Sequence, residues 1–475
     1  MKTTHKGLLL GILALAQFMV VLDASIVNVA LPAIMQSLHF STENLQWIVT
    51  AYTLAFGGFL LFGGRAADLF GRRKIFIIGL VSFTIASMFV GAAQNETMMI
   101  AARAVQGLAA AFMSPAALSI VLTEFREGKD RNRALGVWSA VAAGGAAAGL
   151  LFGGLLTQYL GWRWDFFINV PVGIALTYLA LRFVPKHEST VDHNDLDLPG
   201  AALVTGGLMT LVFAITKAPE WGWTSMGTIG LIAAAIVLLV LFVINESRSK
   251  HPLMPLSIFK IRNLTGANIT QLPITAAMFS MFFFISLYLQ EIKGYSPLQT
   301  GLSFLPFTIV IALVSTNMSR FIGKYGYKPF MVAGPSFIAI ALLFLSHISV
   351  DGNYFTTVLP GIMLLAFGAA MSFVSISVAA TSGVPQHESG LASGLLNTAQ
   401  QVGGALGLAI LSGIAASTTA GITVAASAQE AVVDGYQTAL FVGAFFAIAA
   451  ALVAFFVVRQ PKTRTVSAEP VVIHG

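Results

Sequence analysis

The chain has 475 residues, of which 56% are hydrophobic and only 10% are charged, and its mean hydropathy is +0.82. The apolar residues far outnumber what the core of one soluble domain could bury, so the composition predicts an all-α polytopic membrane protein and excludes a soluble one. There is no cysteine, which excludes disulfides and thiol-ligated metals, and the net charge of +6 has to be assigned loop by loop.

Apolar runs of about twenty residues, each long enough to cross a hydrocarbon core of ~30 Å as a helix, recur along nearly the whole sequence. Several of these runs contain Gly or Pro, which membrane helices tolerate. We predict fourteen transmembrane helices, at residues 8–31, 45–64, 75–93, 97–122, 134–158, 166–184, 198–217, 226–245, 265–290, 298–318, 330–348, 354–380, 391–416 and 436–458.

The positive charges are distributed unevenly between the two sides of this arrangement. Of the 26 Lys and Arg, 22 fall on the side of the N-terminus, three (Arg163, Lys217 and Lys293) fall on the other side, and Arg103 lies within a span. Because positive loops stay in the cytoplasm, we expect both termini to be cytoplasmic. The expected location is a cytoplasmic membrane of the bacterial type.

A faint internal repeat divides the chain. Residues 63–74 resemble residues 318–329, and the Gly144-Gly145 pair corresponds to Gly403-Gly404. Parallel six-span repeats are typical of transporters with a central site between the two halves. We therefore predict a six-span bundle at 1–186, two extra spans at 187–262, a second six-span bundle at 263–460 and a tail at 461–475.

The segment "LDASIVNVALP" (22–32) places a carboxylate, Asp23, inside the first span. An ionised carboxylate deep in the membrane costs a few kcal/mol or more, so it is retained where it faces a partner or a water-filled cavity. Counting ~1.5 Å per residue along the helices puts Asp23 and Arg103 of the fourth span at depths that agree within a helical turn. We interpret Asp23 as the group that binds and releases a proton and Arg103 as the residue that tunes it. The alternative is a static ion pair, and we find no other deep carboxylate.

Other polar and small residues within the spans are candidates for the transport path. We assign Gln17, Asn28, Tyr52 and Gln106 to a substrate cavity, although Asn28 and Gln106 could instead bond a neighbouring helix. The fifth span carries a glycine every four residues, a pattern that allows another helix to approach closely. We expect Gly145, Gly149 and Gly153 to pack against such a helix.

Four motifs lie at matching topological positions: "LDASIVNVALP", "GRAADLFGRRK" (64–74), "RAVQGLAAA" (103–111) and "GWRWDFFINVPVG" (161–173). Together they resemble the fourteen-span drug:proton antiporters of the major facilitator superfamily, the EmrB and QacA type. The resemblance implies the major facilitator fold, with two six-helix bundles plus two extra spans. It also implies a loop that fastens the halves together in one state, carried here by Gly64, Asp68, Gly71, Arg72 and Arg73. One departure is Leu150, where that family has a proline.

The predicted function is proton-coupled export of lipophilic, cationic, drug-like compounds, that is, multidrug efflux. There is no phosphate-cradling Gly-Lys-Ser loop, and the histidines lack metal-ligand spacing, so we expect no enzyme activity, no cofactor and no metal. The expected partners are small lipophilic substrates, protons and membrane lipid, without nucleic acid, and we expect a monomer. The alternatives are a proton-coupled transporter of one specific metabolite and, less favoured, a membrane sensor.

Overall fold

Long apolar helices run through the computed structural model, which describes residues 3–125, 129–185, 197–384, 389–422 and 427–460. Thirteen helices among these residues are long and apolar enough to cross a membrane. The helix α6 (Lys129–Tyr159) has 31 residues, or ~46 Å at 1.5 Å per residue, and occupies the place of the predicted fifth span. The described residues contain no strand, so the all-α prediction is confirmed.

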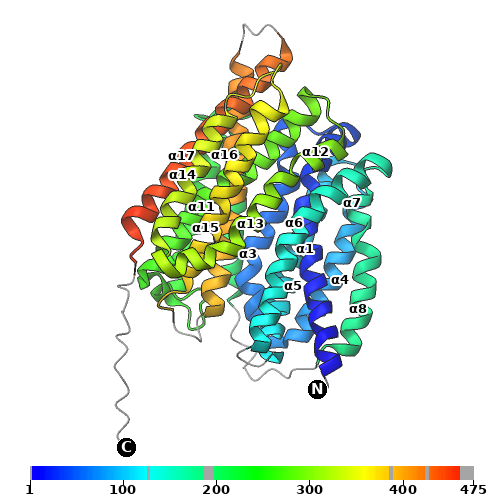
Figure 1. Ribbon diagram of the computed structural model, residues 1–475, viewed down its shortest axis with the longest axis vertical. Helices are drawn as coiled ribbons and strands as arrows, with labels where there is room; N and C mark the ends of the chain where they lie inside the picture. Colours follow the sequence, from blue (N-terminus) through cyan, green and yellow to red (C-terminus); the bar gives the residue numbers. More distant parts are fainter. Residues whose placement is uncertain (1–2, 126–128, 186–196, 385–388, 423–426, 461–475) are drawn as a thin grey trace, which may run out of the picture.

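Each half of the chain forms one bundle, and the two lie side by side (Figure 1). The first half contains α1 (Thr3–Leu38), α2 (Thr42–Leu45), α3 (Trp47–Phe70), α4 (Arg72–Gly91), α5 (Glu96–Glu124), α6, α7 (Trp164–Phe167) and α8 (Asn169–Phe183). The second half contains α11 (Arg262–Leu287), α12 (Pro297–Ser303), α13 (Leu305–Tyr325), α14 (Lys328–Leu345), α15 (Leu359–Thr381), α16 (Ser389–Gly421) and α17 (Ala428–Val457). Single π-helical turns, Tyr288–Ile292 and Tyr354–Val358, follow α11 and precede α15.

The predicted tenth span is not one helix. It begins as α12 and restarts as α13 after Phe304, and a proline occupies the first turn of α13. Proline has no N–H to donate, so it is well tolerated in the first turn of a helix, where that N–H would have no partner within the helix. The sixth span is likewise divided at Ile168 into α7 and α8.

The internal repeat has a counterpart in the packing. In the first half α6 packs along α1, and in the second half α16 packs along α11. Glycines make both approaches close: a Cβ on Gly153 would lie 2.8 Å from the Ile26 carbonyl oxygen of α1, and a Cβ on Gly403 would contact the Leu272 backbone of α11. Equivalent helices therefore meet through small residues in both halves, although at different positions of the repeat.

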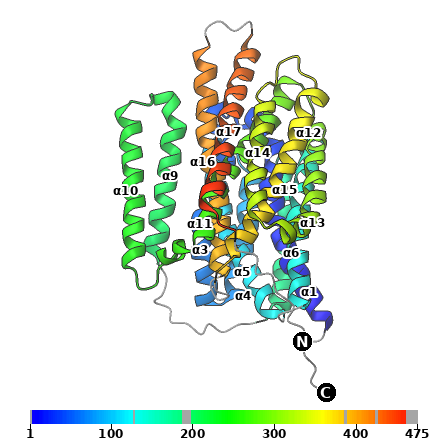
Figure 2. The same cartoon turned by 60° about the vertical axis from the view of Figure 1, so that its left-hand side comes forward.

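The two extra helices, α9 (Leu198–Trp221) and α10 (Met226–Arg248), are central in the sequence but peripheral in space. Helix α9 packs against α3 and α16, one helix from each half, and α10 packs on α9. Figure 2 shows the pair on the flank of the bundle. The predicted boundary near residue 186 and the predicted tail at 461–475 lie outside the described residues.

The bundle has two ends, which we name for the description of the site. The Arg72 face is the end where α3 passes into α4 through Gly71; the start of α1 and the end of α17 lie at the same end (Figure 1). Gly71 has a φ of 95°, a conformation that favours glycine. The far face is the opposite end, where α6 turns into α7 and where α12 lies.

Candidate functional site

The structure brings Asp23 of α1 and Arg103 of α5 into direct contact. Both side chains are fully buried, and the Arg103 Nη1 donates to the Asp23 Oδ2 over 2.5 Å. A charge-assisted bond of this length is among the stronger polar contacts in proteins. Asp23 and Arg103, which were predicted to lie at similar depths in two antiparallel helices, thus form an ion pair.

Three further residues complete a buried group that we call the central cluster, consisting of Asp23, Ser87, Arg103, Gln106 and Asn169. The Asp23 Oδ1 accepts hydrogen bonds from the Gln106 Nε2 at 2.7 Å and from the Asn169 Nδ2 at 3.0 Å. Gln106 also donates to the Ser87 Oγ and accepts from the Arg103 Nη1, both at 2.7 Å. The carboxylate therefore has three donors from two other helices, α5 and α8, which compensates for its removal from water.

Arg103 is held from several sides. Its Nε donates to the Ile48 carbonyl oxygen at 2.9 Å, and its guanidinium lies 4.3 Å from the centre of the Tyr52 ring and 5.7 Å from that of Phe166. Stacking on aromatic faces stabilises a desolvated guanidinium. Its Nη2 has no hydrogen-bond partner among the residues that the structure describes.

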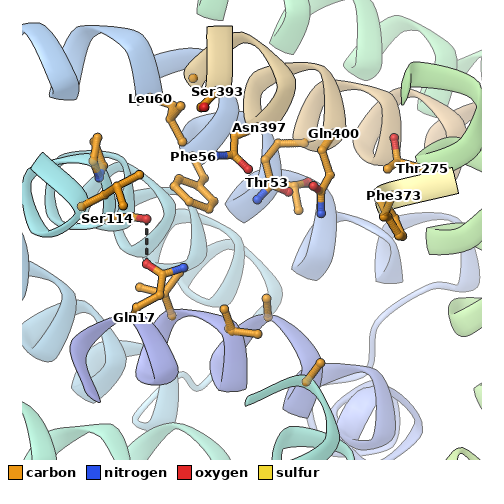
Figure 3. A pocket seen from close by; sticks show the side chains of 18 of the residues that line it. Gln17, Thr53, Phe56, Leu60, Ser114, Thr275, Phe373, Ser393, Asn397 and Gln400 are labelled. Atoms are coloured by element: carbon orange, nitrogen blue, oxygen red, sulfur yellow. Dashed lines mark hydrogen bonds between the residues drawn. The ribbon is translucent and has the colours of Figure 1, made fainter. Parts of the chain in front are cut away.

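A cavity of about 980 Å³ separates the two halves. Its wall combines phenylalanines with hydroxyl and amide groups from both halves, and the close-up in Figure 3 shows Gln17 and Ser114 on one side with Asn397 and Gln400 on the other. The Ser114 Oγ donates to the Gln17 Oε1 at 2.7 Å, which joins α5 to α1. The phenylalanines of the wall are Phe56, Phe279, Phe282, Phe307 and Phe373.

The predicted cavity residues have different positions. Gln17, Asn28 and Tyr52 line the cavity, whereas Gln106 does not and belongs to the central cluster. Our placement of Gln106 in the cavity was wrong because its amide points to the Asp23 side of α5. The Asn28 Nδ2 bonds carbonyl oxygens of its own helix, at 3.2 and 3.3 Å.

Asp23 itself is not part of the cavity wall, whereas Arg103 and Tyr52, which stack on each other, are part of it. The ion pair therefore presents its cationic member to the cavity and its carboxylate to the interior of the first half. A proton on Asp23 would act on the cavity through Arg103.

A second deep carboxylate, Asp165 of α7, was missed in the sequence. It is fully buried, and its Oδ2 accepts from the Thr157 Oγ1 of α6 at 2.5 Å. Residue 165 precedes the predicted start of the sixth span by one position, so its carboxylate was assigned to a loop. Its spacing of four residues from Asn169 places both on one helical face, and this was the available signal.

The residues of the predicted gating loop lie at the Arg72 face. Asp68 and Arg72 form an ion pair of 3.1 Å, Arg73 donates to the Leu181 carbonyl oxygen of α8, and Gly71 provides the turn between them. Gly64 and Asp68 also line the cavity. These hydrogen bonds stay within the first half, so the loop does not fasten the halves together in this conformation.

The halves instead meet at the far face, in contacts that we call the far-face seal. A Cβ on Gly154 of α6 would lie 2.7 Å from the Pro297 carbonyl oxygen of α12. Leu150, the residue at the expected proline position, lies against Gly301 in the same contact. Hydrogen bonds between the halves here are Ser286 Oγ to Asn28 O at 2.6 Å, Gln290 Nε2 to Val29 O at 2.9 Å and Leu298 N to Gln158 Oε1 at 3.2 Å. The cavity is thus closed at the far face, while its wall extends to the Arg72 face.

The three glycines that were predicted to pack closely against a helix all lie against α1. A Cβ on Gly149 would lie 2.6 Å from the Ser25 Cβ and 2.8 Å from the Leu22 carbonyl oxygen, whereas a Cβ on Gly145 would lie 3.2 Å from the Val21 Cβ. The closest approach is therefore at Gly149, beside the turn of α1 that carries Asp23.

Gly149→Ala should lower the free energy of unfolding by about 1–3 kcal/mol, as overpacking does. It should also slow transport several-fold, because the added methyl group pushes α1 away from α6. Gly144→Ala is the matched control, since a Cβ there meets nothing within 4 Å. Thermal unfolding in detergent and dye efflux measure the two effects. Equal behaviour of the two variants would show that this contact is unimportant.

Residues 13–408 match the family described as Major Facilitator Superfamily. The chain is 39% identical to a puromycin resistance protein of Streptomyces alboniger over 439 residues, which are 91% of this chain and 87% of that protein. It is 37% identical to a cephamycin export protein of Amycolatopsis lactamdurans, over 88% of this chain and 87% of the relative.

Among solved structures, an auto-inhibited peptide transporter of the POT family has a similar fold, with a TM-score of 0.71. It is 16% identical in sequence, and the match covers 97% of this chain and 98% of that one. This similarity concerns the fold, whereas the family match and the two relatives extend to the sequence. On these grounds the chain belongs to the Major Facilitator Superfamily.

Proposed function

We propose that this protein is a proton-coupled exporter of small lipophilic compounds, lipophilic cations among them, in a bacterial cytoplasmic membrane. The observation that carries the proposal is the fully buried Asp23, paired with an arginine that forms part of the wall of a cavity between the two halves. The relatives named as resistance and export proteins support the outward direction. The cavity is built from both halves of one chain, which supports a monomer as the working unit.

The Arg72 face is proposed to be cytoplasmic. The predicted topology assigns 22 of the 26 Lys and Arg to the side that contains Arg72, and the cytoplasm retains positively charged loops. With this orientation the described conformation has its cavity open to the cytoplasm and closed to the outside, as an exporter needs when it takes up its cargo.

Proton coupling would operate through the Asp23–Arg103 bond. While Asp23 is ionised it holds α1 to α5 through Arg103 and Gln106 and to α8 through Asn169. A proton on Asp23 removes its charge and weakens these bonds together. Since α1 contributes to both the central cluster and the far-face seal, protonation would change the relative free energies of the two conformations.

Cargo recognition would be broad. The phenylalanines of the wall offer apolar surface without a fixed geometry, and the amides of Gln17, Asn397 and Gln400 supply hydrogen bonds at a few points. The Asp68–Arg72 pair, which is local to the first half here, would bridge the halves once the cytoplasmic side closes.

Transport of ethidium, a monovalent lipophilic cation, by everted vesicles tests the function. We expect accumulation in the lumen, which corresponds to the cell exterior, when the lumen is acidic, and its loss when the gradient is collapsed by a protonophore. Vesicles without the protein are the control. Accumulation that persists without any pH gradient would contradict proton coupling, and accumulation in right-side-out vesicles alone would contradict export.

A further inference from the structure

Asp165 lies on the far-face side of the central cluster. Helix α8 ends at the Arg72 face, where Arg73 donates to the Leu181 carbonyl oxygen, so the start of α7 points to the far face. Asn169 bonds Asp23 directly, and Asp165 precedes Asn169 by four residues, or ~6 Å along the helix. A proton that comes from the far face therefore reaches the level of Asp165 before that of Asp23.

Within the described part of the chain, no cation forms an ion pair with the Asp165 carboxyl group. Its Oδ2 is bonded to the Thr157 hydroxyl, and its Oδ1 has no partner among the described residues. The Asp23 carboxylate, which has the same sign of charge, bonds Asn169, four residues after Asp165. Arg163, its neighbour in sequence, bonds the Ala93 carbonyl oxygen and stacks on Trp162.

Charge balance connects the two carboxyl groups. Among the described residues, the charged side chains with no exposed surface are one arginine, Arg103, and two acids, Asp23 and Asp165. An isolated ion in a low-dielectric interior is costly, and two nearby carboxylates resist ionising together. The neutral arrangement is an ionised Asp23 paired with Arg103 and a protonated Asp165. If the proton moves to Asp23, the total charge of these three residues stays the same and the negative charge lies on Asp165.

Thr157, the hydrogen-bond partner of Asp165, lies in a stretch of α6 that contacts the second half. Thr157 lies on α6 between two residues of the far-face seal, Gly154 and Gln158, which contact Pro297 and Leu298 of α12. Opening of the seal would displace this stretch of α6 and expose the region around Asp165 to the far side. The carboxyl group is thus sealed in the described conformation and is placed to meet water first when the far face opens.

We propose that Asp165 is a second proton-binding residue, which takes each proton from the far side and passes it to Asp23. The inference rests on the proposed proton-coupled function. In the transfer the Asp165 acid group loses the proton and becomes a carboxylate, and the Asp23 carboxylate gains it and gives up its ion pair with Arg103. One proton crosses per cycle, because the two groups share it.

The test compares Asp165→Asn with wild type in everted vesicles loaded at lumen pH values from 5 to 8 with the outer pH fixed, and with ethidium as the probe. We expect Asp165→Asn to require at least tenfold more lumen protons for its half-maximal rate, with an unchanged dependence on the outer pH. Asp165→Glu should restore most of the lumen response. Glu220→Gln, which removes an exposed acid of α9, is the matched control and should behave as wild type.

Thr157→Val keeps the acid but removes its hydrogen bond. The lumen pH that gives the half-maximal rate, which we call the lumen midpoint, should therefore change while transport persists. This variant provides the test if Asp165→Asn fails to insert into the membrane. An unchanged lumen midpoint in Asp165→Asn, or equal shifts on both sides of the membrane, would overturn the proposal. An unchanged midpoint in Thr157→Val would overturn it as well. Wild-type vesicles that ignore the pH gradient would instead refute the proposed function itself.

Discussion

Asp23→Asn should reduce pH-gradient-driven efflux to the level of vesicles without the protein. Asparagine has nearly the shape of aspartate but cannot be protonated, so no change of charge is left to alter the bonds with Arg103, Gln106 and Asn169. Asp23→Glu keeps an acid and should keep part of the activity. Ethidium accumulation in everted vesicles under a fixed pH gradient measures the effect.

A measurement of ethidium binding distinguishes a loss of proton coupling from damage to the fold in Asp23→Asn. Because Asp23 is not part of the cavity wall, Asp23→Asn should bind ethidium within a few-fold of wild type while its efflux is lost. Fluorescence titration of the purified protein gives this comparison. Wild-type efflux by Asp23→Asn would refute the assignment of the proton to Asp23.

Arg103→Met should have the largest effect on stability. It leaves Asp23 buried without its cation, and breaking a buried pair from one side costs about 3–5 kcal/mol. The double variant Asp23→Asn/Arg103→Met removes both charges and should recover much of that loss. Thermal unfolding of the purified variants in detergent provides the measurement.

An exposed pair provides the control for Arg103→Met. Arg72 is paired with Asp68 over 3.1 Å, but both side chains contact solvent, so Arg72→Met should change the free energy of unfolding by less than about 1 kcal/mol. If Arg103→Met is as mild as Arg72→Met, or if the double variant is no more stable than Arg103→Met alone, the central ion pair does not stabilise the bundle.

Helix breaks and the positions of single carboxyl groups show the limit of prediction from sequence. Phe304 lies within the predicted tenth span, and hydropathy alone does not reveal that α12 ends there. Asp165 was assigned to a loop because a one-residue difference at the edge of a span decides between water and protein interior. Ser87 and Asn169 are ordinary polar residues in apolar helices, and only their proximity to Asp23 makes them part of the site.

The sequence by itself determined the membrane class, the repeat of the two halves and the depth match of Asp23 with Arg103. These follow from local composition and from the constant rise of a helix, which need no knowledge of neighbours. The tertiary structure decided which side chains meet across helices: Gln106 with Asp23 and not with the cavity, Thr157 with Asp165, and α9 with one helix of each half. The physical reason is that a helix in a bilayer is free to rotate about its axis and to choose its neighbours until close packing and the satisfaction of buried polar groups select one arrangement.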